Sequence, residues 1–213
     1  ASTTYSQPYA VARQMASLDV VSGGRAAWNV VTSTQSNEAA NFGLSQPLDH
    51  DVRYERAHEF VEAVKGLWDT VEEGVLVADK DSGILFDTDR IHAYHHEGKF
   101  FTVNGILNVP PSPQGRPVLV QAGASGPGRD LAASIADIIF AQLPTIETAQ
   151  DVYRDLKARI EAKGRNPHKV LLMPGFTPVI GRTREEAEGQ LAELDAMIDP
   201  VISIPMLSNY IGV

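Results

Sequence analysis

The sequence predicts an α/β protein built on a parallel β-sheet, and three features of the second half of the chain support this. Two short apolar runs, PVLVQAG (117–123) and ADIIFAQ (136–142), have the length and continuous hydrophobicity of buried strands. A helical pattern follows each run, and Gly or Pro residues mark the boundaries. Strands that alternate with helices in this way form parallel sheets joined by crossover helices. The pattern is compatible with a doubly wound sheet and with a barrel, and it slightly favours the barrel.

The first half of the chain is expected to contain a β-prone stub, two helices and one strand. The first helix starts near a proline and stops at a glycine pair, and the second has an apolar stripe at helical spacing with an acidic residue in its first turn. In order, the elements are the stub 1–5, a helix over 8–21, a strand over 26–33, a polar loop over 34–49 and a helix over 51–68.

Residues 70–116 are the least regular part of the chain, because five glycines and three prolines interrupt every pattern within it. A few short strands are expected there. Loops longer than about 12 residues are usually functional, and a barrel carries such loops at its active-site end. We therefore expect 70–116 to form a lid-like insertion within one domain that spans residues 1–213.

Regular structure is expected again from residue 117 to residue 198. Small residues in ASGPG lead from the first apolar strand into a helix, and a capping-box pair, Thr183 and Glu186, opens the last one. In order, the elements are the strand 117–123, a helix from about 124, the strand 136–142, a helix over 145–163, a strand within 169–181 and a helix over 184–198.

The composition excludes several classes of protein. A formal net charge of −9 argues against nucleic-acid binding and against attachment to an anionic membrane. The absence of Cys excludes disulfides, thiolate metal sites and cysteine nucleophiles. No apolar run reaches the roughly 18 residues of a membrane span, and the first residues lack the pattern of a signal peptide. These features predict a soluble, cytoplasmic protein.

Two groups of residues have the spacing of a ligand site, and each also has a purely structural interpretation. Ser125 and Gly126 lie where a strand passes into a helix, and N–H groups at a helix start favour an anion. A plain tight β–α turn explains these small residues equally well. His50 and Tyr54 are four residues apart and so share one helical face, where both can hydrogen-bond a phosphate or a sugar chain. On the residues alone, a capping His with a core Tyr is the better interpretation.

Other polar residues are less informative. A cluster of three histidines, His92, His95 and His96, suggests zinc, but adjacent histidines without Cys make a poor ligand set, and we predict no metal site. Arg53 and Arg56 could add positive charge near His50 and Tyr54, but such arginines are more often surface residues, and this is the expectation here. GASGPG matches neither the nucleophile elbow G-x-S-x-G nor the dinucleotide motif G-x-G-x-x-G.

Longer segments resemble one enzyme family. They are STTYSQPYAVARQMASLDVVSGGRAAWNVVTS, HDVRYERAHEFVEAVKGLWD, SPQGRPVLVQAGAS and VIGRTREEAE. In this order they resemble the nitrilotriacetate, dibenzothiophene-sulfone and pristinamycin monooxygenases, a branch of the luciferase-like, reduced-flavin-dependent enzymes. The resemblance runs from residue 1 to about residue 198 and matches the middle of such an enzyme. It implies a (β/α)8 TIM barrel of the bacterial luciferase type, incomplete at both ends.

The resemblance also implies a function. Enzymes of this family use reduced FMN from a separate NADH-dependent flavin reductase, together with O2, to oxidise a small organic substrate. C–N or C–S bond cleavage is a frequent outcome. The flavin contacts implied here are His50, Tyr54, Ser125 and Gly126, with Asn29 as a further candidate because a polar residue in a buried strand needs a partner. No catalytic residue is assigned, and a homo-oligomer is expected. The alternatives are an F420-dependent oxidoreductase on the same barrel and a non-catalytic flavin-binding fragment.

Overall fold

The computed structural model describes residues 1–211, and these belong to two compact units. The first unit spans Ala1–Gly175 and contains all the strands found within residues 1–211. The second begins at Phe176 and consists of helices α6 (Arg184–Ala196) and α7 (Pro200–Ile211). Within residues 1–211, none of the helices combines the length and apolar character that crossing a lipid bilayer requires.

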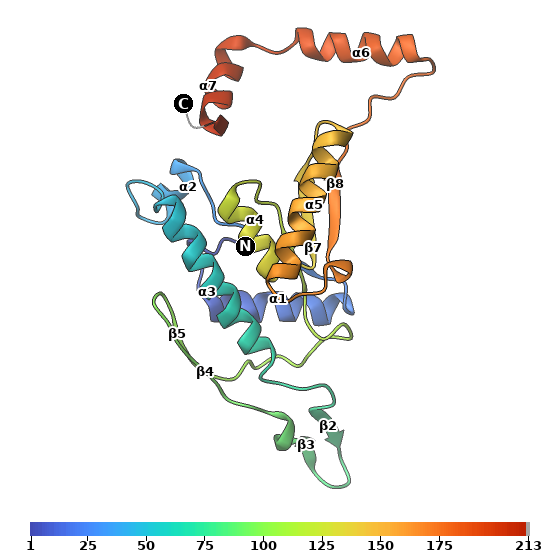
Figure 1. Ribbon diagram of the computed structural model, residues 1–213. Helices are drawn as coiled ribbons and strands as arrows, with labels where there is room; N and C mark the ends of the chain where they lie inside the picture. The colour runs from blue at the N-terminus through green and yellow to red at the C-terminus, as the bar shows by residue number, and fades with distance from the viewer. Residues whose placement is uncertain (212–213) are drawn as a thin grey trace. The chain divides into compact units, whose positions relative to one another are not determined.

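The first unit is organised around a four-stranded parallel sheet (Figure 1). Its strands, in spatial order, are β1 (Ala27–Val30), β6 (Val118–Gln121), β7 (Ile138–Gln142) and β8 (Leu171–Gly175). The spatial order is also the chain order, so the winding never reverses. Right-handed crossovers in one direction place all helices on one face of a sheet. This is the winding of a barrel rather than that of a doubly wound sheet, which reverses at a switch point.

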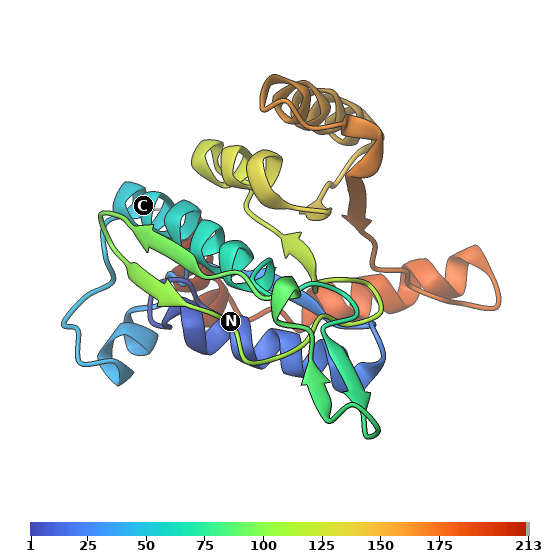
Figure 2. The same cartoon turned by 90° about the horizontal axis from the view of Figure 1, so that it is seen from below.

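Four helices cover one face of this sheet. They are α1 (Pro8–Ser22), α3 (His50–Trp68), α4 (Gly126–Ile135) and α5 (Ile146–Ala162), and each contacts the next one in this order. Figure 2 shows α4 and α5 side by side above the strands that they connect. Local signals set the ends of these helices. The hydroxyl of Thr145 accepts the N–H of Thr148 at the start of α5, and Gly23 ends α1 with φ of 67°.

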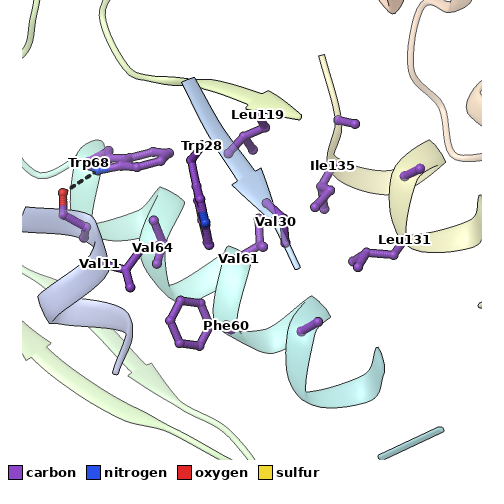
Figure 3. Close-up of a cluster of buried hydrophobic side chains, with 14 of the residues drawn as sticks. Val11, Trp28, Val30, Phe60, Val61, Val64, Trp68, Leu119, Leu131 and Ile135 are labelled. Carbon is purple, nitrogen blue, oxygen red and sulfur yellow. Dashed lines mark hydrogen bonds between the residues drawn. The ribbon is translucent and has the colours of Figure 1, made fainter. Parts of the chain in front are cut away.

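The core lies between the sheet and the helix layer. Trp28 of β1 is fully buried, and its ring contacts Phe60 and Trp68 of α3 at centroid distances of 5.9 and 6.2 Å. The indole N–H of Trp68 donates to the carbonyl of Ala12 at 2.9 Å, so the polar group of this buried ring is hydrogen-bonded (Figure 3). Leu119 of β6 extends the same cluster towards α4.

The opposite face of the sheet is open. Side chains alternate along β1, so Trp28 and Val30 are buried while Ala27 and Asn29 are exposed. Asn29 pairs in register with Val120 of β6, and this face continues with the exposed Phe140 of β7 and Met173 of β8. The expectation that Asn29 is a buried strand residue that requires a hydrogen bond is therefore wrong. Its side chain points away from the helix layer and is exposed.

The irregular segment between α3 and β6 contains two antiparallel hairpins, in agreement with the few short strands expected there. One pairs β2 (Leu76–Asp79) with β3 (Ile84–Phe86), followed by the 3-10 turn Thr88–Arg90. The other pairs β4 (Tyr94–Glu97) with β5 (Thr102–Gly105). The second hairpin packs on α3, which anchors this part of the segment to the first unit.

Several predicted boundaries differ from the structure. A short helix, α2 (Ser36–Asn41), lies within the segment expected to be a loop, because six residues are too few to establish a helical period. Helix α7 was not predicted, since Pro205 in its middle argues against a helix. The stub at residues 1–5 makes a single parallel bridge, Ser2 to Val31, instead of a strand. The last strand occupies only Leu171–Gly175 of 169–181, after a 3-10 turn at Pro167–Lys169.

Candidate functional site

The candidate site lies along the carboxyl edge of the parallel sheet. Val30 and Gln121 are register partners, so the segments that follow β1 and β6 leave the sheet at the same edge. Helices that connect parallel strands run back from this edge, and α3 and α4 both follow such strands. Ligands of barrels and of open α/β sheets bind at this edge, because the connecting loops supply the polar groups there.

The loop after β6 is held by its own polar groups. The side-chain oxygen of Gln121 accepts the N–H of Gly123. Ser125 is the N-cap of α4, and its Oγ accepts the N–H of Gly128 at 3.2 Å. A hydroxyl both accepts and donates, so the Ser125 hydrogen is left to donate to a ligand oxygen. Pro127 has no N–H, and the N–H of Gly126 is the first of the helix.

Two glycines make this loop tight. A Cβ on Gly123 would lie 2.8 Å from the Cα of Gly128, and one on Gly128 would lie 2.9 Å from the Cα of Gly123. The two backbones are therefore in direct contact, which no larger residue permits. A Cβ on Gly126, by contrast, would meet nothing within 4 Å. The loop thus leaves open space beside the first N–H of the helix, next to a hydroxyl donor, and this fits a phosphate group.

His50 and Tyr54 lie together at the start of α3. Their ring centroids are 4.9 Å apart, as the four-residue spacing predicts. The capping role suggested for His50 belongs instead to Asp49, whose side chain accepts the N–H groups of Asp51 and Val52. His50 is exposed and hydrogen-bonds Asp51 at 2.9 Å, while Tyr54 is half-buried against the core. Among the described residues, Nε2 of His50 and the hydroxyl of Tyr54 have no hydrogen-bond partner, so both can contact a ligand at this edge.

The prediction that Arg53 is a surface residue is wrong. Arg53 is only 8% exposed, and one guanidinium nitrogen donates to the carbonyl of Ser33, in the segment that follows β1. Its Nε finds no hydrogen-bond partner among residues 1–211. The helical period contained this information, because Arg53 precedes the buried Ala57 and Phe60 by four and seven residues.

Arg56, also expected at the surface, is half-buried. Its guanidinium lies 4.2 Å from the ring centroid of Phe101, and its Nε donates to the carbonyl of Thr3 at 3.2 Å. Burial lowers the pKa of Arg56, and the charge of Glu59 opposes this shift. Arg56 therefore joins the first residues of the chain to the β4–β5 hairpin, a role that no local pattern predicts.

The histidine cluster is dispersed. His92 pairs with Glu72 at 2.7 Å and His96 with Glu59 at 3.3 Å. In the part of the chain that the structure describes, no group of three or more His, Cys, Asp or Glu side chains is arranged to hold a metal ion. The His92 pair lies within the irregular segment itself, whereas His96 ties this segment to α3.

The sequence model of the family described as "Luciferase-like monooxygenase" matches residues 1–208. The chain belongs to this family. This agrees with the resemblance inferred from the residues and with the barrel-type winding of the sheet. The parallel sheet and its carboxyl-edge loops are therefore those of a luciferase-like monooxygenase family member.

Several curated relatives match the whole chain. The chain is 47% identical over 212 residues to N-acetyl-S-(2-succino)cysteine monooxygenase of Bacillus subtilis (strain 168), covering 100% of this chain and 48% of the relative. It is 43% identical over 212 residues to dibenzothiophene-sulfone monooxygenase of Rhodococcus erythropolis, covering 100% and 47%. The chain therefore spans about half the length of these relatives.

Solved structures show the same relationship. The crystal structure of a long-chain alkane monooxygenase matches with a TM-score of 0.92 at 35% identity, covering 100% of this chain and 49% of that one. A riboflavin lyase crystallised with modified FMN and riboflavin also matches with a TM-score of 0.92, at 38% identity, covering 100% and 48%. The fold is that of the luciferase-like enzymes.

Proposed function

We propose that this chain forms the FMN-phosphate-binding part of a flavin-dependent monooxygenase. The observation that carries the proposal is the loop after β6, where the free hydroxyl hydrogen of Ser125 and the open space beside Gly126 suit a phosphate. A family of monooxygenases and a relative crystallised with modified FMN support the choice of flavin.

Each predicted contact has a distinct part in this proposal. Ser125 donates its hydroxyl hydrogen to a phosphate oxygen, and Gly126 donates its backbone N–H. His50 and Tyr54 supply polar and aromatic contacts from the start of α3. Asn29 offers its amide from the open face of the sheet, where a flavin ring edge presents complementary donors and acceptors.

Reduced FMN, when bound, supplies the electrons with which O2 is activated, and the protein binds it, orients it and excludes water. The open face of the sheet is apolar next to Asn29, with Val120 beside it on β6 and Phe140 further along the same face on β7, and an apolar wall keeps water from a reactive centre. We propose that a separate NADH-dependent flavin reductase delivers the reduced flavin. The substrate is then a small organic molecule, and C–N or C–S cleavage is the expected outcome.

The test is a flavin titration of the full-length protein, with oxidised FMN followed by fluorescence and with reduced FMN under anaerobic conditions. Ser125→Ala removes a hydrogen bond to a charged group, so FMN affinity should fall by about tenfold or more. Because this change also removes an N-cap, Ser125→Asp is needed beside it. Asp still caps α4 but repels the phosphate, so stability should be retained while FMN binding is lost. Tyr54→Phe should weaken binding through the loss of its hydroxyl.

Matched controls remove the same groups at positions away from the site. Ser134→Ala removes a hydroxyl from the body of α4, and Tyr153→Phe removes one from α5, so neither should alter FMN affinity. If FMN binds equally well to the wild type and to Ser125→Asp, the phosphate site is wrong. Tight binding of F420 without binding of FMN would favour the deazaflavin alternative.

A further inference from the structure

The guanidinium of Arg129 bridges the loop after β6 to the neighbouring helix. Arg129 lies in the first turns of α4, and its Nε donates to the carbonyl of Ala124 at 3.0 Å. Its Nη1 donates to Oδ2 of Asp155 on α5 at 3.1 Å. One planar group therefore joins the backbone next to Ser125 to a carboxylate on a different helix.

The acceptor on α5 is itself held in place. The second oxygen of Asp155 accepts from Nε of Arg159, one turn further along α5, at 2.9 Å. Partial burial would raise the pKa of the Asp155 carboxyl, but the hydrogen bonds from Arg159 and Arg129 outweigh it and lower that pKa. Asp155 is therefore ionised at neutral pH, and both of its oxygens are engaged in fixed directions.

We propose that Asp155, acting through Arg129, is a positioning residue for the phosphate loop, holding Ala124 and Ser125 in the geometry that receives the FMN phosphate. This rests on the proposed function. Neither residue needs to touch the flavin, since the guanidinium of Arg129 already donates to Ala124 and to Asp155. Apart from the side chains of Gln121 and Ser125, the loop has no side chain of its own that could fix it, because its remaining residues are Gly, Ala and Pro. A hydrogen-bonded side chain from outside the loop can therefore fix the loop geometry.

Two variants separate positioning from simple electrostatic attraction. Asp155→Ala removes a negative charge from the region, so electrostatics alone would strengthen phosphate binding, whereas loss of positioning weakens it. Arg129→Lys keeps the positive charge but loses the planar fork that contacts two acceptors at once. Positioning predicts about tenfold weaker FMN binding for both variants, with little change in riboflavin affinity, since riboflavin lacks the phosphate.

The control is Asp130→Ala. Asp130 pairs with Lys163 at 3.0 Å. This ion pair also joins α4 to the end of α5, and its exposure is similar to that of the Arg129–Asp155 pair, but it does not contact the loop. The Asp130→Ala change removes the same charge from the same pair of helices as Asp155→Ala. The ratio of FMN affinity to riboflavin affinity should nevertheless stay at the wild-type value. Hydrogen exchange of the amides at 123–128, measured without flavin, should become faster in Asp155→Ala and Arg129→Lys and not in Asp130→Ala.

The outcomes are distinguishable. Stronger or unchanged FMN binding by Asp155→Ala, or wild-type affinity and exchange in Arg129→Lys, would overturn the positioning role while leaving the phosphate site intact. Equal affinity of the wild-type protein for FMN and riboflavin would overturn the phosphate site and, with it, this inference.

Discussion

Asp19 connects two sequence motifs that lie about ninety residues apart. Its carboxylate, fully buried in α1, accepts the N–H of Ala26 at 3.0 Å, the side-chain amide of Gln114 at 2.6 Å and the hydroxyl of Ser112. These partners belong to the SGGRA and SPQG motifs that precede β1 and β6. The two motifs thus close the amino edge of the sheet, opposite the candidate site, and in a barrel this edge serves stability.

Replacement of Asp19 by Ala should lower the free energy of unfolding by about 2–5 kcal/mol, because two buried donors and one part-buried donor lose their acceptor. Urea denaturation measures this change. Asp81→Ala, at an exposed turn, should remain within about 0.5 kcal/mol of the wild type. Equal denaturation midpoints for Asp19→Ala and Asp81→Ala would show that the buried network does not contribute to stability.

Among the structural elements, the β4–β5 hairpin depends on one carboxylate of α3. Glu59, whose side chain is 13% exposed, accepts the N–H groups of Phe100 and Phe101 at 3.0 and 2.7 Å. Gly98 gives it room, since a Cβ there would lie 2.2 Å from Oε1 of Glu59. Burial would raise the pKa of Glu59, but the backbone hydrogen bonds and His96 outweigh it and lower that pKa.

This lowered pKa predicts a pH dependence. A carboxylate with a depressed pKa stabilises the fold fully above its unfolded pKa, about 4.3, and the contribution is lost as pH falls through the lower folded value. Glu59→Gln should cost about 1–3 kcal/mol at pH 7, because an amide N–H₂ then faces backbone donors. The difference from the wild type should shrink in acid. Urea denaturation at several pH values between 3 and 7 tests this.

The matched variant for this experiment is Glu55→Gln. Glu55 pairs with Lys99 of the same hairpin at 2.7 Å, but both side chains are more than half exposed. Exposed pairs contribute about 0–1 kcal/mol, so this variant should change little. A cost for Glu59→Gln that did not depend on pH would contradict an ionised carboxylate as the anchor.

At the level of the whole molecule, the sheet has one covered face and one open apolar face. Phe140, Leu171 and Met173 are all exposed on the open face, and β1 and β8 are its edge strands in the described part of the chain. Open apolar sheets with free edges associate, because both apolar surface and backbone groups are left unpaired.

We therefore expect the 213-residue chain on its own to bind the dye ANS and to self-associate. Size-exclusion chromatography with light scattering measures the association. The double variant Phe140→Lys with Met173→Lys should reduce both signals, because two charges then interrupt the apolar face. A monodisperse monomer that does not bind ANS would contradict this expectation.

Local patterns in the sequence determined much of the fold. The apolar runs at 117–123 and 136–142 predicted β6 and β7, and the stripe over 51–68 predicted α3 to within one residue. The capping pair predicted the start of α6, where the Thr183 hydroxyl accepts the N–H of Glu186. These elements could be predicted from the sequence because each signal depends on residues within a few positions of one another.

Only the tertiary structure decided how distant residues meet. It placed Asn29 on the open face and Arg53 in the interior, connected Asp19 to Gln114, and braced the Ser125 loop through Asp155. A sequence period states which side chains share a face, but it does not state what that face packs against. That depends on contacts between segments far apart in the chain, and these form only when the sheet and its helices come together.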